Sequence, residues 1–296
     1  MSCRMATSAI SCSTNKSHSP GDTPMFRLAL LFLMAACSQV WAQARIPADL
    51  KIEESVDAKG KAKVLFIAGT TVFKPGEHDY IGGCRELMKS VAEGGKAAPV
   101  LALEWPTKAE TWNDVASVVF FFDGAEKHQA VAKGRAAQID ALVKKGAGLV
   151  QLHQTADYPE AFTEKAVSWS GGAWKKGIGK RAHWVETFKD FPQHPVFTGV
   201  GAFTIDDGWL WNIKFVDGMK GVTPLLRTVD PKKKDDPKAD AAIIAWAYER
   251  PAGGRSVTFT GGHLHKSLED PNYRRFLTNA ILWSAEKVTA NAAASR

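Results

Sequence analysis

Histidines follow three separate apolar runs of this sequence, and an aspartate follows a fourth. Each lies just beyond its run: His78 beyond Lys63–Thr70, Asp123 beyond Ser117–Phe122, His153 beyond Gly148–Leu152, and His263 with His265 beyond Ser256–Thr260. An imidazole titrates near neutral pH, so it serves as a general acid or base, and its neutral form is a common metal ligand. We therefore expect a site wherever the fold brings these side chains together.

The apolar runs predict a mostly parallel sheet. Four runs of apolar, often branched residues indicate buried strands, at Lys63–Thr70, Val100–Glu104, Ser117–Phe122 and Gly148–Leu152. Two helical patterns lie between them, at Glu77–Glu93 and Gln129–Lys145. Strands that alternate with helices favour βαβ units and a doubly wound α/β sheet flanked by helices. Ligands of such sheets bind beyond the carboxyl ends of the strands, where the histidines stand.

The second half of the chain is richer in strands. Extended segments are expected at His183–Lys189, Phe203–Phe215, Leu225–Val229 and Ala241–Tyr248, before a last helix at Tyr273–Ser284. Ser256–Thr260 is apolar and should rejoin the main sheet. This arrangement would carry His263 to the same edge as His78 and His153.

His153 occupies a strand-to-helix corner, which in many acyl-transfer enzymes holds a serine or cysteine nucleophile. Glutaminase chemistry needs an activated thiolate at that corner. Cys84 lies in a helical pattern beside Leu87 and Met88, where a buried thiol is expected. The sequence therefore excludes glutaminase activity.

An ordered set of motifs resembles the ThuA-like family, named for trehalose utilisation. The motifs are "GEHDY", "GAGLVQLH", a double glycine, "HPVFTG", an acidic pair, "AWAYE" and "TGGHLH", and they extend from about Lys63 to Ser284. The family resembles class I glutamine amidotransferases in fold and has a histidine where those enzymes have their cysteine. The resemblance points to nine residues: His78, His153, Gly171, Gly172, His194, Asp207, Trp246, Gly262 and His263.

From this resemblance we predict His153, Asp207 and His263 as catalytic residues. This chain has Asp206–Asp207 where the family commonly has Asp-Glu, so the carboxylate is ambiguous by one residue. Tryptophan rings suit the apolar faces of sugars. Six residues are predicted to bind substrate: His78, Gly171, Gly172, Trp209, Trp246 and His265.

Two roles remain open for the histidines. His78, His153 and His263 could bind a divalent metal such as zinc, in which case occupancy should fall below about pH 6, where free histidine gains its proton. Alternatively, His153 is a metal-free base. Each residue also has a structural alternative, as a helix-start hydrogen bonder (His78), a turn residue (His153) or a surface residue (His265).

The family's association with trehalose suggests an enzyme acting on a sugar or keto-sugar. A ketone acidifies its α-hydrogens, so a positioned base would allow isomerisation or elimination. A non-catalytic carbohydrate-binding module and a metal-dependent hydrolase are the alternatives.

The charge pattern does not indicate a nucleic-acid partner. The formal charge is +7, but no basic stripe with interleaved aromatics is present, so nucleic-acid binding is not expected. Part of the excess lies in Asp230–Asp240, which has no apolar residue except alanine and reads as a solvated loop.

Residues 1–44 are predicted to be an N-terminal extension and a secretory signal peptide, followed by a single α/β domain at 45–296. Arg27 precedes an apolar run, Leu28–Ala36, and Ala42-Gln43-Ala44 forms an A-x-A cleavage site. The run is too short to span a membrane. Lipidation at Cys37 is the alternative.

The first prediction concerns export. Protein from its native host should be periplasmic or secreted and should begin at Arg45, because the cleavage site follows the apolar run at the usual distance. N-terminal sequencing checks this. A diacylglyceryl group on Cys37 would establish the lipoprotein alternative instead.

Overall fold

Four neighbouring strands of one sheet end at the edge where the polar residues gather. A computed structural model describes residues 46–56, 58–71, 73–132, 134–236 and 240–286. These residues fall within one compact unit, Trp41–Arg296. Their main sheet has, in spatial order, β2 (Ala97–Leu103), β1 (Ala62–Ala68), β3 (Val115–Phe121), β4 (Gly148–Leu152), β11 (Arg255–Phe259), β10 (Ala242–Glu249) and β9 (Val222–Thr228).

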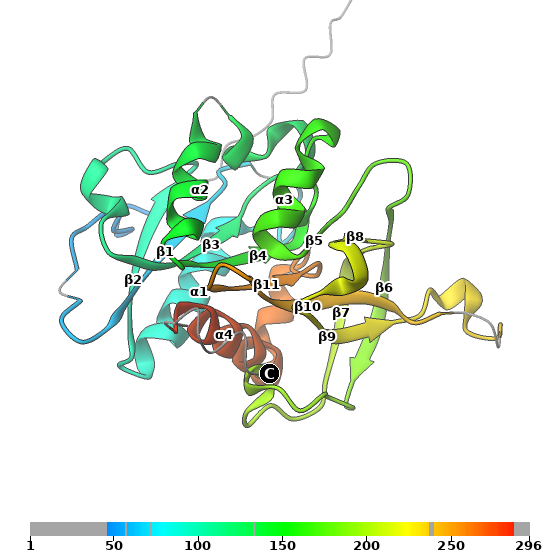
Figure 1. Cartoon of the computed structure of the whole chain (residues 1–296). Helices are drawn as coiled ribbons and strands as arrows, with labels where there is room; N and C mark the ends of the chain where they lie inside the picture. The colour runs from blue at the N-terminus through cyan, green and yellow to red at the C-terminus, as the bar shows by residue number, and fades with distance from the viewer. Residues whose placement is uncertain (1–45, 57, 72, 133, 237–239, 287–296) are drawn as a thin grey trace, which may run out of the picture. The chain divides into compact units, whose positions relative to one another are not determined.

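The five strands from β2 to β11 are parallel, and β10 and β9 add an antiparallel end. Parallel strands need covered faces, and helices lie on both faces here (Figure 1). The helices are α1 (Tyr80–Glu93), α2 (Arg135–Lys144), α3 (Thr163–Ser170) and α4 (Pro271–Ala285). This confirms the predicted doubly wound α/β fold.

Strand β1 shows how the sequence builds two cores. Val64 and Phe66 pack with residues of α1 and α4. Leu65 and Ile67 face the opposite way and pack with residues of α2 and α3. All four side chains are fully buried. Alternate residues of a strand point to opposite faces, so an uninterrupted apolar run serves both layers.

Of the four predicted extra strands, two become β9 and β10 of the main sheet, and the other two form a hairpin beside it. β6 (Lys180–Phe188) pairs with β7 (Phe203–Trp211), and the two-residue strands β5 (Gly172–Ala173) and β8 (Lys214–Phe215) pair with each other. The hairpin is anchored by Trp209, whose ring packs against Phe259 of β11. The anchor brings β6 and β7 to the carboxyl edge of the sheet.

Two helix predictions were wrong in extent. The expected helix Gln129–Lys145 is a single 3-10 turn at Gln129–Val131 followed by α2, because Gly134 between them has a left-handed φ of 78°. The expected helix from Glu77 begins only at Tyr80, where the Asp79 side chain accepts from the Gly82 amide and caps the first turn. The helix α3 was not predicted.

Short 3-10 segments connect the main elements: Ala109–Trp112, Ala125–Lys127, Gln129–Val131, His153–Ala156, Glu160–Phe162, Pro195–Phe197, Asp217–Met219, Pro231–Lys233 and His265–Glu269. Within the described part of Asp230–Asp240, residues 231–236 are exposed, as expected of a solvated loop.

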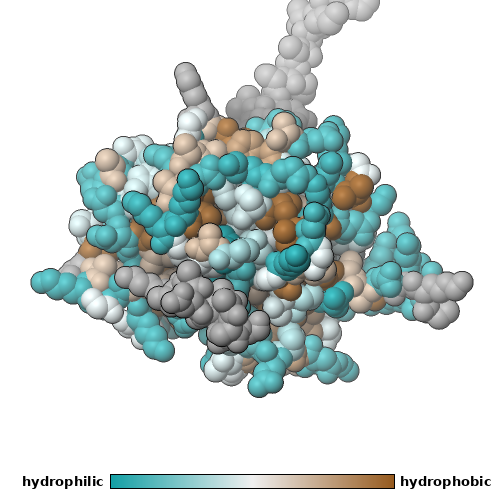
Figure 2. Space-filling view, in the orientation of Figure 1, coloured by the Kyte–Doolittle hydropathy of each residue, from teal (hydrophilic) through white to brown (hydrophobic). Residues whose placement is uncertain are grey.

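Hydrophilic side chains cover much of the face shown in Figure 2. Among the described residues, no helix is long and apolar enough to cross a bilayer. The predicted leader, its cleavage site and Cys37 lie outside the described residues.

Candidate functional site

Three imidazoles converge at the carboxyl edge of the sheet. His78 follows β1, His153 follows β4 and His263 follows β11. One ring nitrogen from each lies within 4.8 Å of the other two. The His78 Nε2 atom is 2.6 Å from His263 Nδ1 and 3.2 Å from His153 Nε2. The predicted convergence of these residues is therefore confirmed, although 185 positions separate His78 from His263.

Hydrogen bonds on the outer side of two rings fix where their protons lie. His153 Nδ1 is 3.0 Å from the Thr260 carbonyl oxygen, so this nitrogen must donate. Tyr80 donates its hydroxyl proton to Asp123 Oδ1 (2.7 Å), and its oxygen accepts from His78 Nδ1 (3.2 Å). A neutral imidazole has one N–H, so the Nε2 atoms of both rings present lone pairs to the centre.

The third ring completes a set of acceptors. His263 Nε2 faces Glu77 Oε2 at 3.7 Å, and its Nδ1 faces His78 Nε2. In the tautomer that has its proton on Nε2, toward this carboxylate, the inward Nδ1 atom also presents a lone pair. Lone pairs at these distances repel unless a proton or a cation lies between them. Ligand histidines characteristically donate their outer N–H to a carbonyl or carboxylate. His153 does so with the Thr260 carbonyl, and His78 donates to the Tyr80 hydroxyl.

Burial keeps the three imidazoles neutral. His78 and His153 are each only 3% exposed. Burial, with the neighbouring His263, lowers the pKa of His78 to about 4. Burial and then His78 lower the pKa of His153 well below its usual value, and burial lowers that of His263. Neutral imidazole is the form that binds metals.

Both buried histidines lie in strained backbone. His78 has a φ of 51° and His153 a φ of 55°, in the left-handed region that non-glycine residues rarely occupy. Such residues cost about 1–3 kcal/mol each and gather at functional sites. His153 therefore occupies a sharp corner after β4, as an elbow nucleophile would, and its position argues against a purely structural turn residue.

The loops that hold His78 and His263 pair with each other through the backbone. The His78 amide donates to the His263 carbonyl, and the His265 amide donates to the Gly76 carbonyl, both at 2.9 Å. Glu77 and Leu264 form an antiparallel bridge between the same loops. Two ligand positions are thus fixed by main-chain hydrogen bonds, independently of any bound ion.

The Asp207 side chain holds the loop that contains His263 through hydrogen bonds to its backbone. Its buried carboxylate accepts from the amides of Gly208 (2.8 Å), Gly262 (2.8 Å) and His263 (2.7 Å). Burial raises its pKa to about 6, against these hydrogen bonds. Asp206 instead lies at the surface and pairs with His183 at 2.9 Å. The structure therefore gives the two aspartates separate positions, and Asp207 positions His263 through the backbone.

Several other predicted site residues lie in the core. Trp246 is fully buried, with its indole N–H donating to the Ser170 carbonyl. Gly171 ends α3 in a left-handed conformation, and a Cβ there would lie 2.7 Å from Tyr248. A Cβ on Gly172 would lie 2.7 Å from Phe215. As assignments to substrate binding, these three are corrected to packing roles, because none has a free surface at the histidine cluster.

Of two further predicted residues, Trp209 lies beside the histidine cluster and His194 does not. Trp209 borders a hollow that His153 and His263 also line. Trp209 is only 1% exposed, so its ring forms a buried wall of the hollow and not an open surface for stacking. His194 lies elsewhere, where its ring accepts from the Val196 amide and packs against Trp283. It shapes a loop, as a His-Pro corner does.

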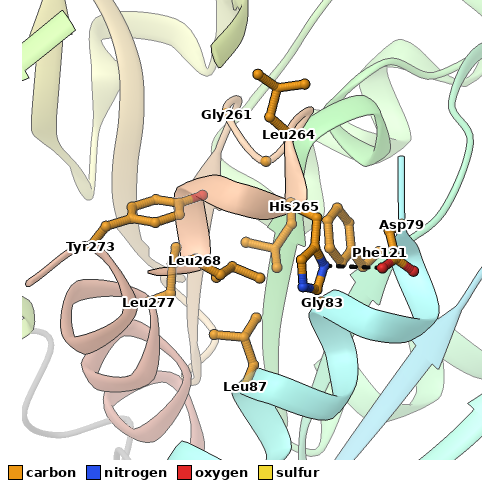
Figure 3. A pocket seen from close by; sticks show the side chains of 12 residues that line it. Asp79, Gly83, Leu87, Phe121, Gly261, Leu264, His265, Leu268, Tyr273 and Leu277 are labelled. Atoms are coloured by element: carbon orange, nitrogen blue, oxygen red, sulfur yellow. Dashed lines mark ion pairs between the residues drawn. The ribbon is translucent and has the colours of Figure 1, made fainter. Parts of the chain in front are cut away.

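His265 points away from the three imidazoles. It pairs with Asp79 at the start of α1, with 3.1 Å between Nδ1 and Oδ2, and borders a mostly apolar cavity with Leu268 and Tyr273 (Figure 3). That cavity leaves about 10 Å³ for the centre of a water molecule, which is too little for a sugar. His265 therefore closes the loop onto α1 and does not face a substrate-sized space.

Cys84 is buried and free, as expected. Burial raises the pKa of its thiol, so a thiolate does not form near neutral pH. Sequence reasoning overlooked Tyr80 and Thr260, which fix the ring orientations, and Arg181 and His183 on β6. The alternation of Arg181 and His183 along a strand was a usable signal, since residues two apart face the same side.

The sequence and the fold are similar to those of known proteins. Residues 63–284 match the model of the ThuA family, described as trehalose utilisation. A ThuA-like protein of Bacteroides uniformis ATCC 8492 is 16% identical, with a TM-score of 0.53 over 78% of this chain and 94% of that chain. One of Parabacteroides merdae ATCC 43184 is 14% identical, with a TM-score of 0.55 over 77% and 92%. These likenesses show the fold. No curated protein matches the sequence.

The second prediction tests Asp207. In Asp207→Asn, an amide N–H replaces one acceptor and faces a backbone N–H, so the unfolding free energy should fall by about 1–3 kcal/mol. Zinc affinity should fall about 10–100-fold, since the loop that holds His263 loses its support. Urea unfolding and zinc titration measure both. Asp206→Asn, at a surface position, should change stability by less than about 0.5 kcal/mol. Wild-type zinc affinity in Asp207→Asn would contradict this role.

Proposed function

The chain belongs to the ThuA family, and we propose that it is an exported enzyme acting on sugars at the cluster of His78, His153 and His263. The observation that carries this proposal is the convergence of three imidazole nitrogens, two of them from histidines in left-handed backbone. A hollow of about 210 Å³ borders His153 and His263 and gives the cluster an opening to solvent. A purely structural cluster would need neither the backbone strain nor the opening.

The residues fit a divalent ion such as zinc. Zinc–nitrogen bonds of about 2.0–2.1 Å place tetrahedral ligand nitrogens about 3.3 Å apart. The 3.2 Å spacing between His78 and His153 matches, and the 2.6 Å spacing to His263 is shorter. Three protein ligands leave a fourth position for substrate, the usual pattern of a catalytic site. A divalent ion held there would polarise a sugar oxygen.

Residues around the cluster would hold the three imidazole rings in position. Thr260 and Tyr80 hold two of the rings through hydrogen bonds from outside, and Glu77 faces the third, so the inward nitrogens of His78 and His153 present lone pairs. We propose an oxidised sugar such as a keto-glycoside as substrate, because its α-hydrogens are acidic and a base positioned at the hollow can remove one. Return of the proton to the neighbouring carbon would give isomerisation, and loss of a leaving group β to the carbonyl would give elimination. Addition of water to the eliminated product would complete a hydrolysis.

A non-catalytic carbohydrate-binding module is less well supported. Such a site would use exposed tryptophan faces, and Trp209 and Trp246 are buried. In the described part of the chain, four large hydrophobic residues are exposed, and only one of them, Phe73, is aromatic.

The third prediction concerns pH. The lowered pKa values mean that protons compete for these imidazoles only at lower pH than for free histidine, and for His78 near pH 4. Bound zinc should therefore persist at pH 6 and pH 5 and leave as the pH approaches 4. Elemental analysis after dialysis at each pH measures this. Loss of the metal already at pH 6 would show that the imidazoles titrate as free histidines.

The fourth prediction separates metal chemistry from a metal-free base. His153→Ala should lose bound zinc and turnover together in a screen of oxidised and unoxidised disaccharides, and chelation should inactivate the wild type. His194→Ala, outside the cluster, should keep both. Full turnover after exhaustive chelation would overturn the metal role. His153 would then be a general base, and its loss should lower the rate about 10²–10⁴-fold.

A further inference from the structure

The hollow beside the histidine cluster has a basic lining. Its ionisable lining residues are all bases: His153, Arg181, His183 and His263. Among the described residues, no carboxylate lines it. Arg181 and His183 come from β6, two positions apart, and so face the same side of that strand. A ligand in the hollow therefore meets hydrogen-bond donors from the hairpin on one side and the imidazole cluster on the other.

The Arg181 guanidinium is held in place by neighbouring side chains but stays exposed to solvent. Its Nη2 atom donates to Asp157 Oδ2 at 2.9 Å, and its guanidinium lies 4.4 Å from the centre of the Trp174 ring. The Asp157 side chain is 5% exposed, whereas that of Arg181 is 53% exposed. A buried carboxylate and an aromatic ring thus fix one edge and one face of the guanidinium. The rest of the planar donor group stays accessible.

We propose that Arg181 determines specificity by binding a carboxylate of the substrate, so that the preferred substrate is a sugar acid rather than a neutral sugar. This inference rests on the proposed sugar-directed function. A guanidinium fixed along one edge presents further N–H donors in a planar fork that matches a carboxylate. A sugar hydroxyl is neutral and accepts through one oxygen, whereas a carboxylate carries the opposite charge and accepts through two oxygens at once.

The positions of the acidic partners of His183 and Arg181 support this assignment. Asp206 accepts from His183 Nε2 and does not line the hollow. The Arg181 partner, Asp157, does not line it either. The two acidic side chains of these pairs therefore orient the bases from outside the space that a ligand would fill. A carboxylate in the hollow would meet no like charge among the residues that line it.

Binding tests the inference without turnover. In calorimetric titrations of the full chain, glucuronate should bind at least about tenfold more tightly than methyl glucoside, as a charge-assisted carboxylate pair implies. Arg181→Gln should abolish this preference by weakening glucuronate alone. Arg181→Lys, which keeps the charge but not the fork, should retain part of it. Arg227→Gln, which removes an exposed arginine that donates to the Ala241 carbonyl, is the matched control.

Two outcomes would overturn the inference: equal affinity of the wild type for both sugars, or equal weakening of both by Arg181→Gln. If Arg181→Gln unfolds, Arg181→Lys keeps the test, because it retains the charge beside Asp157 but lacks the planar fork, and should weaken glucuronate more than methyl glucoside. With a turnover assay, Arg181→Gln should raise KM for the acidic substrate and leave kcat nearly unchanged. If no sugar is turned over, the proposed function fails, and the binding preference still decides the role of Arg181.

Discussion

The buried carboxylate of Asp207 is the constraint on which the site depends. It joins β7, in the second half of the chain, to the loop after β11 by accepting from the amides of Gly262 and His263. Without those bonds, two buried amides of a glycine-rich loop would lack partners, at about 1–3 kcal/mol each. The same loop pairs with the backbone at His78. One side chain therefore sets the position of His263 and, through it, the spacing of the cluster.

The site concentrates costs that the fold must offset. Two histidines occupy left-handed backbone, three imidazole nitrogens face one another, and a carboxylate is fully buried. The parallel strands β1, β3, β4 and β11 are neighbours, so their carboxyl ends deliver these groups to one place. The two apolar layers against the sheet supply the stability that allows such strain. This distribution is typical of a functional site.

The sequence predicted the sheet and the histidine cluster better than the surroundings. Apolar runs marked the strands because parallel strands are buried on both faces, and β4 matched its prediction at both ends. Residue type did not separate packing from binding: Trp246 and Gly171 are core residues, and Gly134 divides a helix that periodicity joined. Arg181 and Tyr80 act through partners more than twenty positions away, Asp157 and Asp123, which no local pattern reveals.

X-ray absorption spectroscopy of the zinc-loaded protein tests the central claim most directly, because it reports the atoms bound to the metal. The account predicts one zinc per chain with three imidazole nitrogens at about 2.0–2.1 Å and an additional light-atom ligand. His78→Ala, His153→Ala and His263→Ala should each remove that signal. A stoichiometric zinc whose spectrum is unchanged in all three variants, or a wild type that takes up no metal, would contradict the claim that these imidazoles form a metal centre.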